Sequence, residues 1–152
     1  MTRKSTWTNA DGLVVGFGPN IAERNVAGVF DTAGVVKEAR LAITNLSSGA
    51  KVTVPAGSAV VGVLVKVGAA WVGGTKVEVG DATDPDGFIT AAQGATAELT
   101  VGKTIVAAGA YAVGDAATNA GLGKVYAAAT DLTVTITGTF TAGSADVIVR
   151  YI

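Results

Sequence analysis

Three carboxylates stand close together in one short segment of the sequence. Asp81, Asp84 and Asp86 are interleaved with turn-forming residues, and closely spaced carboxylates on a loop are the ligands that calcium prefers. The spacing is not that of an EF-hand. Residues 84–87 read Asp-Pro-Asp-Gly, which is a strong turn signature because Asp side chains bond to nearby backbone N–H groups. We therefore expect a turn without a functional metal, and whether the loop binds a cation stays open.

The residue types that most often perform catalysis are scarce. The chain has no Cys and no His, so it lacks the commonest general base, the usual zinc ligands and the ordinary nucleophile–base pairs. Carboxylate pairs such as Glu23 with Asp31, or Glu78 with Glu98, are of the type that hydrolyses glycosides. Nothing in their spacing selects them, so we expect no enzyme, no catalytic residue and no cofactor.

Composition limits the class of partner. The chain has 152 residues, of which 49% are hydrophobic and 15% charged, and its net charge is −1. This length fits one domain, or one domain plus an arm. No basic run could neutralise several phosphates, and neither a secretory signal nor an apolar membrane span is evident. We expect an unsecreted, soluble protein that binds neither nucleic acid nor membrane.

Several segments alternate apolar and polar residues with the period of a β-strand. Residues 132–140 alternate with threonines, and residues 147–151 alternate again after the link 141–144, which predicts a C-terminal β-hairpin. The segment Val60–Val67 is apolar on both faces, which predicts a central strand or an oligomer contact. Further strands are expected over 39–44, 51–54 and 76–79, with weaker candidates over 98–101, 104–107, 110–113 and 124–127.

This pattern predicts an all-β chain in two parts. Glycines interrupt every apolar run of residues 1–36, which predicts an extended N-terminal arm. Residues 37–152 predict an antiparallel β-sandwich, jelly-roll-like in type. The arm is too rich in glycine to bury its own bulky side chains, so we expect them to pack on another subunit. The expected interface residues are Trp7, Leu13, Val14, Val15, Phe17 and Phe30.

Three segments also carry a family resemblance: residues 7–18 (Trp-Thr-Asn-Ala-Asp-Gly-Leu-Val-Val-Gly-Phe-Gly), 52–57 (Val-Thr-Val-Pro-Ala-Gly) and 79–88 (Val-Gly-Asp-Ala-Thr-Asp-Pro-Asp-Gly-Phe). With these segments the chain resembles small virion proteins of tailed bacteriophages, in particular capsid decoration, or cement, proteins. The resemblance implies a β-sandwich or jelly roll that is commonly a homotrimer. It also implies the major capsid protein as partner, and a place on the outer surface of the virion after assembly in the host cytoplasm.

Two other functions stay open beside this one. A tail or head-fibre component that attaches to host-surface glycans would show aromatic and polar clusters at its loop tips, and this sequence has few aromatic residues there. A polysaccharide hydrolase would need a carboxylate pair in a cleft. The sequence alone leaves the choice between head, tail and fibre undecided, as it does the oligomer number and the strand order.

Overall fold

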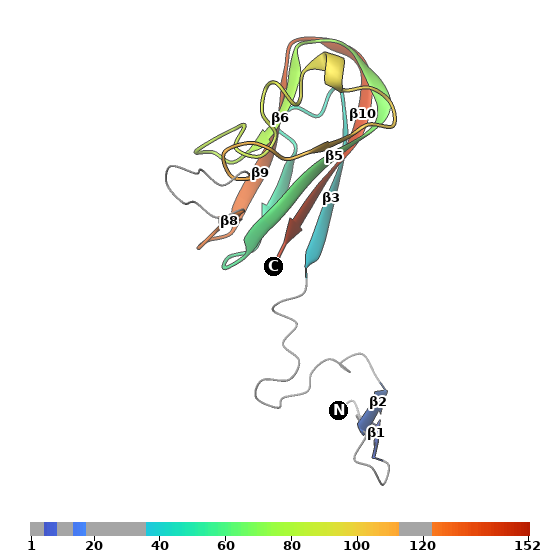
Figure 1. Cartoon of the computed structure of the whole chain (residues 1–152), viewed down its shortest axis with the longest axis vertical. Helices are drawn as coiled ribbons and strands as arrows, with labels where there is room; N and C mark the ends of the chain where they lie inside the picture. Colours follow the sequence, from blue (N-terminus) through green and yellow to red (C-terminus); the bar gives the residue numbers. More distant parts are fainter. Residues whose placement is uncertain (1–4, 9–13, 18–35, 113–122) are drawn as a thin grey trace. The chain divides into compact units, whose positions relative to one another are not determined.

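The computed structural model describes residues 5–8, 14–17, 36–112 and 123–152. The chain divides into two compact units, Met1–Val35 and Val36–Ile152. In the first unit, strands β1 (Ser5–Thr8) and β2 (Val14–Phe17) form an antiparallel pair (Figure 1). Most of the predicted arm lies outside the described residues, so the extended arm and its boundary stay predictions.

The second unit is a sandwich of two antiparallel sheets (Figure 1). The large sheet has the order β3 (Lys37–Thr44), β10 (Phe140–Tyr151), β5 (Ala59–Gly73) and β7 (Thr104–Val106), and β8 (Lys124–Val125) also pairs with β5. The small sheet has the order β4 (Lys51–Val54), β9 (Thr130–Thr137) and β6 (Lys76–Gly80). A single 3-10 turn, η2 (Thr96–Glu98), lies between β6 and β7. The predicted all-β antiparallel sandwich is confirmed.

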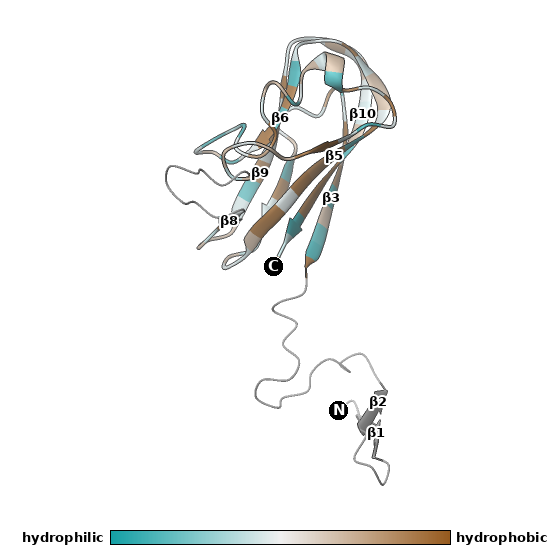
Figure 2. Ribbon diagram, viewed as in Figure 1, coloured by the Kyte–Doolittle hydropathy of each residue, from teal (hydrophilic) through white to brown (hydrophobic). Residues whose placement is uncertain are grey.

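The two-residue period of the sequence explains where the core lies. Successive side chains of a strand point to opposite faces, so every second apolar residue enters the space between the sheets. In β5, Val63, Val65 and Val67 are buried, and across the core Leu132 and Val134 of β9 are buried as well. Figure 2 shows hydrophobic residues along much of β5. Within the described ranges, no helix has the length and apolar character needed to cross a membrane.

The central strand predicted around Val60–Val67 is confirmed, because β5 lies between β10 and the pair β7 and β8. Only one of its faces is fully buried. The ladder with β10 is irregular between Val60 and Gly62, so the alternation shifts there: Val60 is buried and Val61 is 46% exposed. Leu64 is half-buried on the face that points away from the small sheet. We call this the outer face of the large sheet. The oligomer contact predicted there stays a prediction.

The predicted C-terminal hairpin is wrong, although both of its strands exist. Strand β9 pairs with β4 and β6, whereas β10 pairs with β3 and β5, so consecutive strands belong to different sheets. The chain turns at Gly138, whose φ is +85°, and residues 141–144 lie inside β10 where its ladder with β5 is irregular. Alternation reports which face of a strand is buried but says nothing about its partner strand.

Two weaker strand predictions are also wrong, while the other two are confirmed. Strands β7 and β8 match the segments 104–107 and 124–127. The segment 98–101 forms no strand, because Glu98 ends the 3-10 turn and Val101 begins another turn. In the segment 110–113, residues 110–112 form a turn and residue 113 lies outside the described residues. The latter turn is fixed by Tyr111, whose N–H donates to the carbonyl of Gly87 while its own carbonyl accepts from Gly123. These segments therefore serve the loop network described next.

Candidate functional site

Four of the six predicted interface residues fall on the small ladder of the first unit. Trp7 lies in β1, and Val14, Val15 and Phe17 lie in β2. The register aligns Trp7 with Val15 and Ser5 with Phe17. The other two, Leu13 and Phe30, lie outside the described residues. The backbone thus brings Trp7, Val14, Val15 and Phe17 together, and their contact with another subunit stays a prediction.

The Asp81 loop contains the turn that the sequence predicts at residues 84–87, where the Gly87 N–H donates to the Asp84 carbonyl at 3.1 Å. Asp81 follows β6 directly and its side chain is buried, with the residue 4% exposed. Its Oδ1 accepts the backbone N–H groups of Thr83 at 2.8 Å and Asp84 at 2.9 Å, while its own N–H donates to the Asp84 carbonyl at 3.0 Å. One carboxylate therefore satisfies two backbone donors of the turn, as Asp commonly does.

The same carboxylate also binds three side chains from a distant part of the chain. Its Oδ2 accepts from Lys124 Nζ at 2.7 Å and from the Tyr126 hydroxyl at 2.9 Å, and its Oδ1 accepts from the Tyr111 hydroxyl at 3.3 Å. Lys124 Nζ lies 3.6 Å from the centre of the Tyr111 ring, within cation–π range. We call Asp81, Tyr111, Lys124 and Tyr126 the Asp81 cluster.

The charges of the cluster are fixed by its hydrogen bonds. Burial on its own raises the pKa of Asp81, but the bonds from Lys124, the Asp84 N–H and Tyr126 outweigh it and lower the pKa to about 2. Burial lowers the pKa of Lys124, yet its bond to Asp81 gives a net increase. Burial and the Asp81 charge both raise the pKa of Tyr126. Asp81 is therefore a firmly ionised acceptor, which suits neither proton donation nor an open metal site.

The other two loop carboxylates lie nearer the surface. The pKa of Asp84 is raised by partial burial and by the neighbouring Asp86. Among the residues that the structure describes, no group of three acidic side chains is placed to hold a metal ion. Both Asp81 oxygens are taken up by protein donors, so Asp81, the most buried of these carboxylates, is not free to bind a cation.

Close packing holds the loop against the cluster. A Cβ added at Gly87 would lie 2.4 Å from the Tyr111 ring, and one added at Gly80 would lie 2.1 Å from the Asp84 carbonyl. Both positions therefore require glycine, because no real Cβ atom lies so close to its neighbours. Sequence reasoning found the turn but missed Tyr111, Lys124 and Tyr126. They are 30 to 45 positions away from Asp81, and no local pattern connects them to it.

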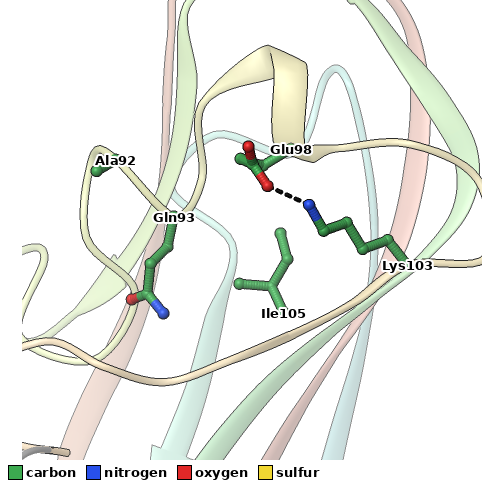
Figure 3. A pocket seen from close by; sticks show the side chains of 5 residues that line it. All are labelled: Ala92, Gln93, Glu98, Lys103 and Ile105. Carbon is green, nitrogen blue, oxygen red and sulfur yellow. Dashed lines mark hydrogen bonds and ion pairs between the residues drawn. The ribbon is translucent and has the colours of Figure 1, made fainter.

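A shallow depression of about 340 Å³ lies beside η2 (Figure 3). Its lining residues are Ala92, Gln93, Glu98, Lys103 and Ile105. Glu98 and Lys103 form an ion pair across it, and the Gln93 amide is used within the protein: Nε2 donates to the Val106 carbonyl and Oε1 accepts the Ala108 N–H. The depression thus presents few unused polar groups, and none of its lining residues is aromatic. These are poor features for binding a glycan.

The outer face of the large sheet combines apolar and charged rows. One cross-strand row contains Arg40, Ile148, Leu64 and Val106 in adjacent strands. Ile148 is 6% exposed although it lies outside the core, and Val106 is 60% exposed. In the next row Glu38 pairs with Arg150, with Glu38 Oε2 3.3 Å from Arg150 Nε.

Glu38 also reaches along its own strand, where its Oε1 lies 2.7 Å from Arg40 Nε. The hydrogen bond from Arg40, partly opposed by desolvation, lowers the pKa of Glu38, and Arg150 adds to this effect. The outer face of the large sheet therefore combines buried and exposed apolar residues with paired charges.

Comparison with known proteins gives a likeness in structure. No known protein family matches the sequence, and no curated protein matches it. Among solved structures, the chain is similar to a chain of the cyanophage Pam1 capsid asymmetric unit. The two are 20% identical, the match covers 84% of this chain and 91% of that one, and the TM-score is 0.58. At this level of identity the likeness shows a shared fold.

Proposed function

We propose that this chain is a structural protein of a bacteriophage virion, and more specifically a capsid decoration protein. In this role it binds the outer surface of the head and stabilises contacts between major capsid subunits. The observation that carries the proposal is the likeness to a chain of a phage capsid asymmetric unit, which extends over 84% of this chain. The resemblance of the loop and arm segments to small virion proteins points the same way.

The strand order supports the finer description as a jelly roll. Strands β3, β4, β5 and β6 alternate between the two sheets, and the first strand of the unit, β3, pairs with the last, β10. Paired Greek keys produce this order in jelly-roll domains of viral capsids. The expectation of a homotrimer rests on the resemblance to decoration proteins.

A non-enzymatic role is part of the proposal. Asp81, the buried acid with the most altered environment, is held ionised by five donors, and the depression beside η2 has its polar groups engaged. A rigid core flanked by a mixed apolar and charged sheet face is suited to contact with other proteins. The predicted anchors of the arm, Trp7 and Phe17, would add bulky side chains to such a contact.

Binding to purified shells tests the proposal directly. Phage heads lacking this protein are mixed with the purified chain, pelleted, and imaged by cryo-microscopy. We expect saturable binding, density for the sandwich on the outer surface, and a shell that resists heating to a higher temperature. A chain that is found in density only on the tail or a fibre, or that stays unbound, would contradict the decoration role.

A further inference from the structure

Strand β3 is an edge strand of the large sheet (Figure 1). It has eight residues, Lys37–Thr44, and its register with β10 runs without a bulge along its whole length. Among the described residues, no strand pairs with its other side. An edge of this kind presents a row of unpaired backbone groups to another chain, and natural edges usually carry Pro, a bulge or a very short strand to prevent pairing. Strand β3 has none of these three.

The hydrogen bonds at the end of β3 show which backbone groups face outward. Asn45 N–H donates to Gly143 of β10, whereas the N–H of Thr44 donates to the Ser47 hydroxyl and the Thr44 carbonyl accepts from Ser47 N–H. Thr44 therefore directs its backbone away from β10. In an antiparallel strand the N–H and C=O groups of every second residue point to the same side. Glu38, Arg40 and Ala42 therefore also present these groups at the free edge.

The charges on β3 are the feature that could protect it. Charged side chains on an edge commonly discourage pairing, above all when they repel an incoming strand. Here, however, the outward-directed positions carry opposite charges two residues apart, Glu38 and Arg40. Such a pair repels another copy in some registers and attracts it in one. The charges therefore select a register and do not prevent pairing altogether.

Parity and charge together define that register. Outward-directed positions are even-numbered, so a second β3 in antiparallel orientation must align even-numbered residues with each other. We name each register by the residue that lies opposite its own copy. Registers centred on Glu38 or on Arg40 place like charges opposite each other, and the register centred on Leu41 places Arg40 opposite Ala42. Pairing centred on Ala39 places Glu38 opposite Arg40 twice. Opposite charges facing each other across strands are stabilising, and like charges are destabilising.

We propose that β3 is a self-association edge, at which it pairs with β3 of a second copy in the register centred on Ala39. Glu38 then faces Arg40 of the partner subunit, and Arg40 faces Glu38 of the partner subunit. The large sheets of the two copies join into one continuous sheet. The contact is isologous and has two-fold symmetry, so it differs from a three-fold contact.

Amide hydrogen exchange of the full-length protein tests the placement of the contact. As protein concentration rises, the amides of Glu38 and Arg40 should become protected, together with that of Ala42, which lies opposite Val36 just before β3 of the second copy. The amides of Ala39 and Leu41 should be protected at every concentration because they donate to β10. Over the same range, sedimentation velocity should show the smallest species doubling in mass. Fast exchange at Arg40 and Ala42 at all concentrations would overturn the proposal.

Charge variants test the register. Glu38→Arg or Arg40→Glu alone places like charges opposite each other at both facing pairs of the contact, and should weaken self-association about tenfold. The double variant Glu38→Arg with Arg40→Glu exchanges the charges and should restore association close to the original level. A double variant that associates as weakly as the single variants would overturn the register. If the edge amides stay protected in both single charge variants, another segment occupies the edge, and the proposal is overturned as well.

A matched control separates this contact from ion pairs within one chain. Arg150 contacts Glu38 from β10 and does not reach the edge, so Arg150→Gln should leave self-association unchanged. The double charge variant restores the ion pair between positions 38 and 40 within one chain as well as across the contact. A mixture of the two single variants restores opposite charges across the contact alone, so it should associate close to the original level, whereas a role confined to the single chain predicts no recovery. Ala42→Pro removes one outward N–H without touching the β10 ladder, and should abolish the doubling in mass while a cooperative melt shows that the chain still folds.

Discussion

The carboxylate of Asp81 and the ammonium group of Lys124 lie 2.7 Å apart, with the Asp81 side chain 4% exposed and that of Lys124 27% exposed. This pair joins the end of β6 to β8, which belongs to the other sheet. The two sheets of the sandwich are therefore connected at this end by a charged contact as well as by the apolar core.

Replacing Asp81 with Asn should destabilise the protein markedly. The amide keeps the size of the side chain but leaves Lys124 without its counter-charge, and breaking a buried pair costs about 3 kcal/mol or somewhat less where one partner is partly exposed. We expect the free energy of unfolding to fall by about 2 kcal/mol in urea denaturation. As a control, Asp131→Asn breaks the exposed pair with Lys51 and should change it little. Equal effects of the two variants would contradict this role for Asp81.

Acid should remove the same contribution in wild type. The pKa of Asp81 is about 2 in the folded protein and about 4 in an unfolded chain. Because the folded pKa is the lower one, the stabilisation is fully present above pH 4 and is lost as the pH falls towards 2. The difference in unfolding free energy between wild type and Asp81→Asn should therefore shrink by roughly 2 kcal/mol across that window. A difference that stays constant with pH would exclude this origin.

Alkali should act on the cluster through Tyr126. Its pKa is raised in the folded protein by burial and by the Asp81 charge, so the unfolded chain ionises first. The stabilisation is present below about pH 10, the usual value of a tyrosine, and declines as the pH rises above it. Tyr126→Phe should reduce this alkaline loss of stability, which thermal melts between pH 8 and 11 can measure. Tyr151→Phe, which removes a hydroxyl from β10, serves as the matched control.

The elements that could be predicted from the sequence are those whose signal is local. The alternation of Val63, Val65 and Val67 predicted both the strand and its buried face, and the Asp-rich turn at 81–87 was found from its turn residues. Pairing partners were not found, because β9 and β10 alternate equally well whether they form a hairpin or belong to separate sheets. Tyr111, Lys124 and Tyr126 were missed for a related reason. Their meeting with Asp81 depends on the completed fold, and each one alone is an ordinary surface residue type.

Calcium should have no effect on stability. Asp81 has both oxygens engaged by donors of the protein, and Asp84 forms hydrogen bonds with Asp86, so the acidic loop offers few free carboxylate oxygens to a cation. A ligand that binds only the folded state raises the melting temperature, so millimolar calcium or a chelator should leave that temperature unchanged. A rise of several degrees with calcium, abolished by Asp84→Asn, would show that the loop binds a cation after all.

The first unit should contribute to assembly more than to folding of the sandwich. All the core residues that the structure describes belong to Val36–Ile152, so a chain that begins at Val36 retains every one of them. We expect it to keep the circular dichroism of a β-protein and a cooperative melt, while it binds phage shells weakly or not at all. In the full-length chain, Trp7→Ala or Phe17→Ala should each cost about 2 kcal/mol of shell binding if these residues are interface hot spots, whereas Arg3→Ala should matter far less. Unfolding of the shortened chain would mean that the first unit completes the sandwich. Shell binding that is unchanged in the shortened chain would assign the contact to the sandwich alone, with the outer face of the large sheet as the next surface to mutate.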